Sequence, residues 1–289
     1  MSITLKEVVE HDLIDKEILE EIPKGCKWCG RDLVFSDSLN NLECLGDENG
    51  RCPGKIGYRL HKMLRKLGYD SMSLEDCQNK AKETGMISPF NMFRAKDLDS
   101  GIKELQKPKK VWEIVELAYI PDISDVAKKL FNGYESMEEA YADIKEAQVP
   151  YIANKLGLTS ASIGFAVHLY NKLLSYEKEL VFGSKLFGVI KDEREKCRIV
   201  VSNNINNYIN KADYINSVMN VCKDKINIIV QGSICKTTDF LIDDNLVQSR
   251  YSSIINDINE KRKEDGLQEI ITMGSEQFMN MMKKSVSEE

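Results

Sequence analysis

The sequence has no long apolar run. No stretch among its 289 residues approaches the roughly 18 consecutive apolar residues of a membrane-spanning helix. Its opening stretch, MSITLKEVVEHDLIDKEILEE, also lacks the basic start and apolar centre of a signal peptide. We therefore expect a soluble, cytoplasmic protein with no membrane partner.

The sequence also has little histidine and no excess of positive charge. His11, His61 and His168 are its only histidines and stand apart from one another, so we expect none of them to bind a metal or act in catalysis. The formal net charge of −6 excludes a protein coated in basic residues. Any contact with nucleic acid must therefore come from local patches.

Four of the eight cysteines lie close together near the start of the chain. They have the spacing C-x2-C, fourteen residues, then C-x7-C, and they are Cys26, Cys29, Cys44 and Cys52. In a reducing compartment such cysteines are metal ligands or free thiols rather than disulfides. Apolar arms at 33–35 and 42 predict a β-hairpin that brings the second pair back to the first. We predict a structural Zn2+ held by four thiolates, which leaves no position for a catalytic water; scattered free thiols are the alternative.

The other four cysteines are widely separated among apolar or helical residues. They are Cys77, Cys197, Cys222 and Cys235. A free cysteine in such a setting behaves as a small apolar side chain, so we predict that all four are buried.

Two kinds of pattern follow the cysteine cluster. Residues 55–183 show short helices with start signals at Ser73 and Ser136 and stop signals at Gly85 and Gly133. The longest helix candidate is 159–180, with an apolar face of Ile163, Val167, Tyr170 and Leu174. From 184 onward, β-branched runs alternate with helices, which predicts a parallel sheet covered on both faces. The fold class predicted is α+β and multi-domain, with a lead segment 1–24 that is a possible partner contact, a four-cysteine zinc module 25–54, an all-α region 55–183 and an α/β domain 184–289 with a four-stranded parallel sheet.

Basic residues gather in local clusters despite the acidic balance. The stretch PGKIGYRLHKMLRK follows Cys52 without one acidic residue, and KPKK precedes Trp112. Each Lys or Arg that neutralises a phosphate releases counterions, so we predict DNA contacts here; a solvated helix face is the alternative. Including two lysines of a later helix, the predicted contacts are Lys55, Arg59, Lys62, Arg65, Lys66, Lys107, Lys109, Lys110, Lys128 and Lys129.

Two stretches have the outline of a helical hairpin. YIPDISDVAKKLF and QVPYIANKLGL each place an apolar residue and Pro before a short turn and a helix. In a helix-hairpin-helix the turn carries glycines whose amides hold a phosphate. Asp122 and Ser124 stand at those positions in the first unit, and Tyr151 and Ala153 in the second. An Asp repels phosphate, which favours packing of these units over phosphate binding; both interpretations stay open at this point.

The order of these modules resembles the C-terminal half of the bacterial NAD-dependent DNA ligases. The matching motifs are CKWC…C…CPGKI for the zinc finger, YIPDISDVAKKL and VPYIANKLGL for the helix-hairpin-helix repeats, and RIVVSN…QGSICKTTDFLIDD…QSRY…IITMGSEQF for a BRCT domain. The last cysteine pair is spaced more widely than in the family, and Phe278 stands where many BRCT domains have Trp.

The resemblance does not extend to the catalytic half of these ligases. Their adenylated lysine lies in a K-x-D-G motif of a nucleotidyltransferase domain, which an OB-fold follows. The one such string here, KEDG at Lys263 to Gly266, follows a predicted helix, and we interpret it as a charged turn. We therefore predict no catalytic or cofactor-binding residue in this chain.

The resemblance implies the non-catalytic subunit of a split ligase, such as those of some bacteriophages, acting in the bacterial host cytoplasm in DNA replication or repair. Its partners would be nicked double-stranded DNA and a nucleotidyltransferase/OB-fold subunit. That subunit would handle NAD and Mg2+, and this chain would carry only structural Zn2+. The alternative is a scaffold protein of a replication or repair complex with the same modules and no ligase activity.

Overall fold

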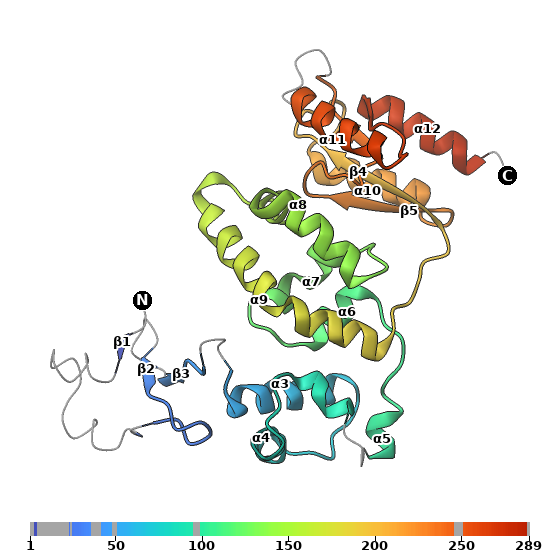
Figure 1. Cartoon of the computed structure of the whole chain (residues 1–289). Coiled ribbons are helices and arrows are strands. Elements are labelled where there is room, and N and C mark those ends of the chain that lie inside the picture. The colour runs from blue at the N-terminus through green and yellow to red at the C-terminus, as the bar shows by residue number, and fades with distance from the viewer. Residues whose placement is uncertain are drawn as a thin grey trace. The chain divides into compact units, whose positions relative to one another are not determined.

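The computed structural model describes residues 3–4, 23, 25–35, 42–47, 51–94, 99–245 and 251–287 (Figure 1). The chain forms two compact units. The first is Met1–Lys107 with Leu117–Tyr119, and the second is Pro108–Glu116 with Ile120–Glu289. The boundaries that the sequence suggested at 54/55 and 183/184 fall inside these units, and most of the lead segment 1–24 lies outside the described residues.

The first unit begins with a small antiparallel sheet. Strands β1 (Ile3–Thr4), β2 (Leu33–Phe35) and β3 (Leu42–Cys44) lie in that order, and Leu33 pairs with Cys44. The predicted hairpin is confirmed by the pairing of β2 with β3, and β1 adds a strand that the sequence did not indicate. Its register places one cysteine of the cluster at the end of β3.

Helices complete the first unit. Helix α3 (Pro53–Lys66) packs on α4 (Leu74–Glu83), and η1 (Pro89–Arg94) and α5 (Ser100–Lys103) follow. The predicted start of α4 is confirmed, since the Ser73 hydroxyl accepts from the Asp76 amide and the Asp76 carboxylate accepts from the Ser73 amide. Cys77 on α4 is fully buried, as predicted.

The second unit opens with a helical region. It comprises α6 (Val111–Leu117), whose last residue belongs to the first unit, and α7 (Ile123–Phe131), α8 (Met137–Leu156) and α9 (Ile163–Phe187). The short η2 (Ser160–Ser162) precedes α9. A break at Gln148, with φ 53° and ψ −137°, divides α8 into two helical pieces. Of the two stretches with a hairpin outline, residues 119–131 lead from α6 into α7, and residues 148–158 begin at the break in α8. They are called the first and the second hairpin below.

The buried face of α9 differs from the predicted one. Ala166, Leu169 and Leu173 are fully buried, whereas Ile163 is 45% exposed and Val167 is 42% exposed. Two apolar stripes lie side by side on this helix, and spacing alone does not distinguish them. Because α8 and α7 pack against α9, the stripe with Ala166, Leu169 and Leu173 is the one that is buried.

The α/β region, residues 195–287, confirms the predicted parallel sheet. Its strands are β4 (Glu195–Val201), β5 (Ile226–Gln231), β6 (Phe240–Ile242) and β7 (Ile271–Met273), in the order β5-β4-β6-β7 with every pair parallel. Helices α10 (Lys211–Cys222) and α12 (Ser275–Ser287) cover the face that carries Ile199 and Val201. Helix α11 (Ser252–Glu264) covers the face that carries Val200 and Leu241.

Local signals were accurate in this region. The Asn210 side chain accepts from the Asp213 amide and starts α10, as predicted. The remaining cysteines predicted to be buried, at 197, 222 and 235, are all buried. None of the helices in the described part of the chain is long and apolar enough to cross a membrane.

Candidate metal centre and nucleic-acid interface

The four clustered cysteines converge on one point in the first unit. Their Sγ atoms all lie within 4.8 Å of one another. The Cys26 and Cys52 Sγ atoms are 3.6 Å apart, and those of Cys29 and Cys44 are 3.3 Å apart. A tetrahedral ion with Zn–S bonds of about 2.3 Å separates its ligands by about 3.8 Å, so the cluster fits Zn2+ with little adjustment.

Local backbone hydrogen bonds and the start of a helix position the cysteines. The Gly30 amide donates to the Cys26 carbonyl at 2.7 Å, which closes the C-x2-C turn, and Gly30 adopts a positive φ of 73°. The Gly46 amide donates to Cys44 Sγ at 3.3 Å, an arrangement that favours a thiolate. Cys52 is the N-cap of α3, with Pro53 in the first turn. The fourth sulfur is therefore fixed to the start of a helix.

The clustered thiols differ in how easily they ionise. Burial disfavours the thiolate of Cys26, but hydrogen bonds from the Trp28 and Cys29 amides outweigh it and lower its pKa to about 7. Burial and then the hydrogen bond with Cys29 raise the pKa of Cys44 to about 12, and burial raises that of Cys52. One anion thus forms readily and the next are resisted. A divalent cation would compensate the charge of these buried thiolates, because it binds thiolates rather than thiols.

The cysteine cluster packs directly on α3. A Cβ atom at Gly54 would lie 2.3 Å from Trp28 Cδ1, so only glycine lets the Trp28 ring rest on the first turn of the helix. The Lys27 ammonium lies 4.7 Å from the centroid of that ring. A metal bound by the cysteines would therefore also orient α3.

Helix α3 exposes a basic face with an aromatic residue at its centre. Lys55, Tyr58, Lys62 and Arg65 are exposed, and their spacing of three or four residues places them on one side of the helix. Lys62 Nζ lies 5.6 Å from the centroid of the Tyr58 ring, and Tyr58 is 48% exposed. Over this face the helix rises about 15 Å. The sequence had not singled out Tyr58, although its position between the lysines would have indicated it.

Arg59 does not belong to this basic face. Its side chain is 8% exposed, and its Nε donates to the Ala118 carbonyl at 2.7 Å. The prediction of Arg59 as a phosphate contact is therefore at odds with its burial, because a guanidinium held inside the unit is not presented to a ligand. Lys66 is exposed next to the basic face, and Arg65 forms a surface ion pair with Asp70 at 3.0 Å.

The other predicted DNA contacts lie apart from α3 in the chain. Lys107, Lys110, Lys128 and Lys129 are exposed, and Lys109 is partly buried with its Nζ 5.7 Å from the centroid of the Phe187 ring. The Lys128 ammonium lies 5.4 Å from the centroid of the Trp112 ring. DNA contact by these lysines stays a prediction, since each of them is also compatible with a solvated surface.

An acidic side chain in the turn of the first hairpin is paired with basic side chains of α9. Asp122, with φ 64°, stands at the start of α7 and accepts from Lys172 Nζ at 2.6 Å on α9. His168 Nε2 lies 3.3 Å from the same carboxylate oxygen. Lys172 above all, and His168 after it, hold the pKa of Asp122 below its ordinary value against the opposing effect of burial. This carboxylate ties the turn to α9 and would repel a phosphate.

The KEDG string is the exposed end of α11. Lys263 and Glu264 close the helix, Asp265 follows as its C-cap, and Gly266 has a φ of 69°. The Gly266 amide donates to the Lys263 carbonyl at 3.1 Å. The prediction of a charged turn is confirmed, and Lys263 lacks the enclosure that an adenylated lysine requires.

A cavity of about 650 Å3 was not foreseen from the sequence. It lies within the second unit, between the starts of α6 and β5 and the connection 190–194. Lys110, Lys191 and Lys223 line it, but so do Glu135 and Glu193. This mixture of signs makes it a polar cleft rather than a dedicated anion site.

Comparison of the chain with protein-family models, curated protein sequences and solved structures found no match in any of the three.

Proposed function

We propose that this chain binds duplex DNA through the exposed face of α3, which a four-cysteine zinc centre holds in place. The observation that carries the proposal is the pairing of four converging thiols with a helix that starts at the fourth of them and exposes Lys55, Tyr58, Lys62 and Arg65. Phosphate contacts supply most of the affinity of sequence-independent DNA binding.

The order of the modules supports a more specific proposal about the protein to which this DNA-binding face belongs. The chain would be the DNA-binding subunit of a two-chain NAD-dependent ligase, with the cysteine cluster as its zinc finger, the helical region as its helix-hairpin-helix array and the α/β region as its BRCT-like domain. The motifs support this assignment, and so does the four-stranded parallel sheet with helices on both faces. A partner chain would then supply the adenylated lysine, NAD and Mg2+.

The DNA-binding part is tested by the salt dependence of affinity for a nicked duplex. The double variant Lys55→Glu/Lys62→Glu should weaken binding and lower the slope of log K against log salt by about 1.8, or about 0.9 for each lost phosphate contact. The control Lys178→Glu/Lys261→Glu makes the same change in net charge at exposed residues of α9 and α11. Equal slopes in both variants would refute the assignment of the α3 face.

The ligase part needs a separate assay. The purified chain with NAD should not adenylylate itself, and it should stimulate nick sealing when mixed with a nucleotidyltransferase/OB-fold chain with which it co-purifies. A chain that binds DNA but neither co-purifies with such a partner nor stimulates sealing would instead be a scaffold of a replication or repair complex. Self-adenylylation that Lys263→Ala abolishes would contradict both the non-catalytic ligase subunit and the scaffold.

A further inference from the structure

The helical piece of α8 that follows the break at Gln148 lies against the end of β5 and the segment after it. This segment, residues 231–238, begins with the last residue of β5 and is here called the β5–β6 loop; it contacts α8 around Tyr151. Tyr151 is fully buried, its hydroxyl hydrogen-bonds that of Tyr134, and Asn154 Nδ2 donates to Ser233 Oγ at 3.4 Å. Tyr151 and Ala153, at the positions where a helix-hairpin-helix turn carries its glycines, are thus buried, whereas Gln148 and Pro150 before them are exposed.

Gly232 allows this close approach. A Cβ atom at this position would lie 2.1 Å from the Tyr151 carbonyl oxygen, far inside van der Waals contact. Gly232 does not have a positive φ, so its backbone would accept another residue if the space were free. The glycine is thus required by the contact between the loop and the turn, and not by the local conformation of the loop.

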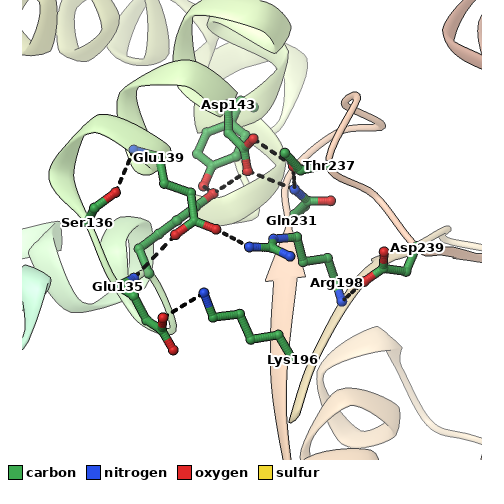
Figure 2. Close-up of polar contacts among 11 residues, drawn as sticks. Glu135, Ser136, Glu139, Asp143, Lys196, Arg198, Gln231, Thr237 and Asp239 are labelled. Carbon is green, nitrogen blue, oxygen red and sulfur yellow. Dashed lines mark hydrogen bonds and ion pairs between the residues drawn. The ribbon is translucent and has the colours of Figure 1, made fainter. Parts of the chain in front are cut away.

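A buried carboxylate stands at the centre of the same contact (Figure 2). Asp143 on α8 is 1% exposed and accepts three hydrogen bonds. Oδ2 accepts from Tyr134 Oη at 2.8 Å and from Gln231 Nε2 at 2.7 Å, and Oδ1 accepts from Thr237 Oγ1 at 2.8 Å. Two of the three donors come from the β5–β6 loop. A buried charge is tolerated only when it is so compensated, and here the compensation requires both regions.

Ion pairs continue the contact toward its edge. Figure 2 shows Glu135 and Glu139 of the helical side pointing at Lys196 and Arg198 of β4. Glu135 Oε2 and Lys196 Nζ are 2.7 Å apart, and Arg198 Nη2 donates to Glu139. Charges of opposite sign thus lie on the two sides in matching order, which fixes the register of one region on the other.

Lys155 of the second hairpin also points into this contact. Lys155 Nζ lies 5.7 Å from the ring centroids of both Tyr134 and Tyr151. Burial of its ammonium lowers the pKa of Lys155 to about 8, although the Asp143 carboxylate opposes this change. In the first hairpin, by contrast, Lys128 and Lys129 are exposed. The two hairpins therefore use their lysines differently.

We propose that the second hairpin is a docking socket for the β5–β6 loop and not a phosphate site. The contact joins the helical region to the α/β region and leaves the positions of Tyr151 and Ala153 inaccessible to nucleic acid. The partner of this surface is the chain's own C-terminal region, recognised through a buried carboxylate and a glycine contact.

Cys235 in the β5–β6 loop offers a direct test, because it is fully buried at this contact. The experiment is alkylation of the native full-length chain with N-ethylmaleimide, followed site by site by peptide mass spectrometry. Cys197 and Cys222, buried in the sheet core, report on the integrity of the α/β region itself. Gly232→Val and Asp143→Leu should each raise the rate at Cys235 by about tenfold or more and leave Cys197 and Cys222 within about twofold.

Gly164→Val is the matched control, because a Cβ atom at Gly164 on α9 meets no atom within 4 Å. It should leave all three rates unchanged. Unchanged labelling of Cys235 in both socket variants would overturn the proposal, as would faster labelling of Cys235 in the wild-type chain when nicked duplex is added.

If a variant also exposes the two core cysteines, the decisive comparison is within the wild-type chain. There Cys235 should react as slowly as Cys197 and Cys222, and a rate about tenfold higher than both would overturn the proposal. Because the labelling of the free chain needs no DNA, its outcome is independent of whether α3 binds a duplex.

Discussion

Arg59 and Lys62 are two cations on one helix that should have opposite roles. Arg59 is buried and donates from Nε to the Ala118 carbonyl at 2.7 Å, whereas Lys62 is exposed beside Tyr58. Arg59→Met and Lys62→Met remove the same charge and keep an unbranched side chain. The first should lower stability without affecting the salt dependence of DNA binding, and the second should do the reverse.

The magnitudes follow from burial. A hydrogen bond from a charged donor contributes about 1.5–3 kcal/mol, and its loss leaves the Ala118 carbonyl without that donor, so Arg59→Met should cost about 2 kcal/mol. Lys62→Met should change stability by less than about 0.5 kcal/mol, as surface substitutions do. It should instead lower the salt slope of DNA binding by about 0.9.

The assay must report on the first unit alone, because a chain of two units need not unfold in one step. Trp28 and Trp112 are the two tryptophans of the chain. In a Trp112→Phe background, Trp28 fluorescence during urea unfolding follows the first unit. With a urea dependence of about 2 kcal/mol per M, the Arg59 substitution should shift the midpoint by about 1 M. An unchanged midpoint together with a reduced salt slope would show that Arg59 contacts DNA and would refute the reasoning.

Three further predictions concern the metal, a close contact and an acid-sensitive turn. Metal analysis should find one zinc per chain. Cys44→Ser should abolish zinc binding and unfold the front segment, because structural zinc binding contributes on the order of 10 kcal/mol to folding. Folded protein without zinc would contradict the site. Gly54→Val should force the Trp28 ring off α3, at a cost of about 1–3 kcal/mol, and red-shift its emission; an unchanged spectrum would mean that the ring does not rest there. The lowered pKa of Asp122 means that its ion pair with Lys172 contributes stability in full above the carboxyl's unfolded pKa and loses it as pH falls through the lower folded value. Asp122→Asn should remove this loss of stability as the pH falls below about 4, where the carboxyl of an unfolded Asp takes up its proton. The effect should be below about 1 kcal/mol because the pair is partly exposed, and acid titrations identical to wild type would contradict it.

The sequence by itself determined the local features. The cysteine spacing indicated a cluster, and the structure brings those four sulfur atoms within 4.8 Å of one another. The capping signals at Ser73 and Asn210 and the β-branched runs of the sheet also appear where they were predicted. Each of these depends on residues close together in the chain, so a short stretch carries the whole signal.

Only the tertiary structure decided which side of an element is used. Arg59 and Lys62 look equivalent in a basic run, but the packing of α3 buries the first and exposes the second. The apolar stripe of α9 was likewise selected by α7 and α8. The contact between the second hairpin and the β5–β6 loop depends on Gly232 and Asp143, which lie far apart in the sequence. The sequence around each residue does not indicate that it forms a contact, because the group that it contacts belongs to a distant segment of the chain.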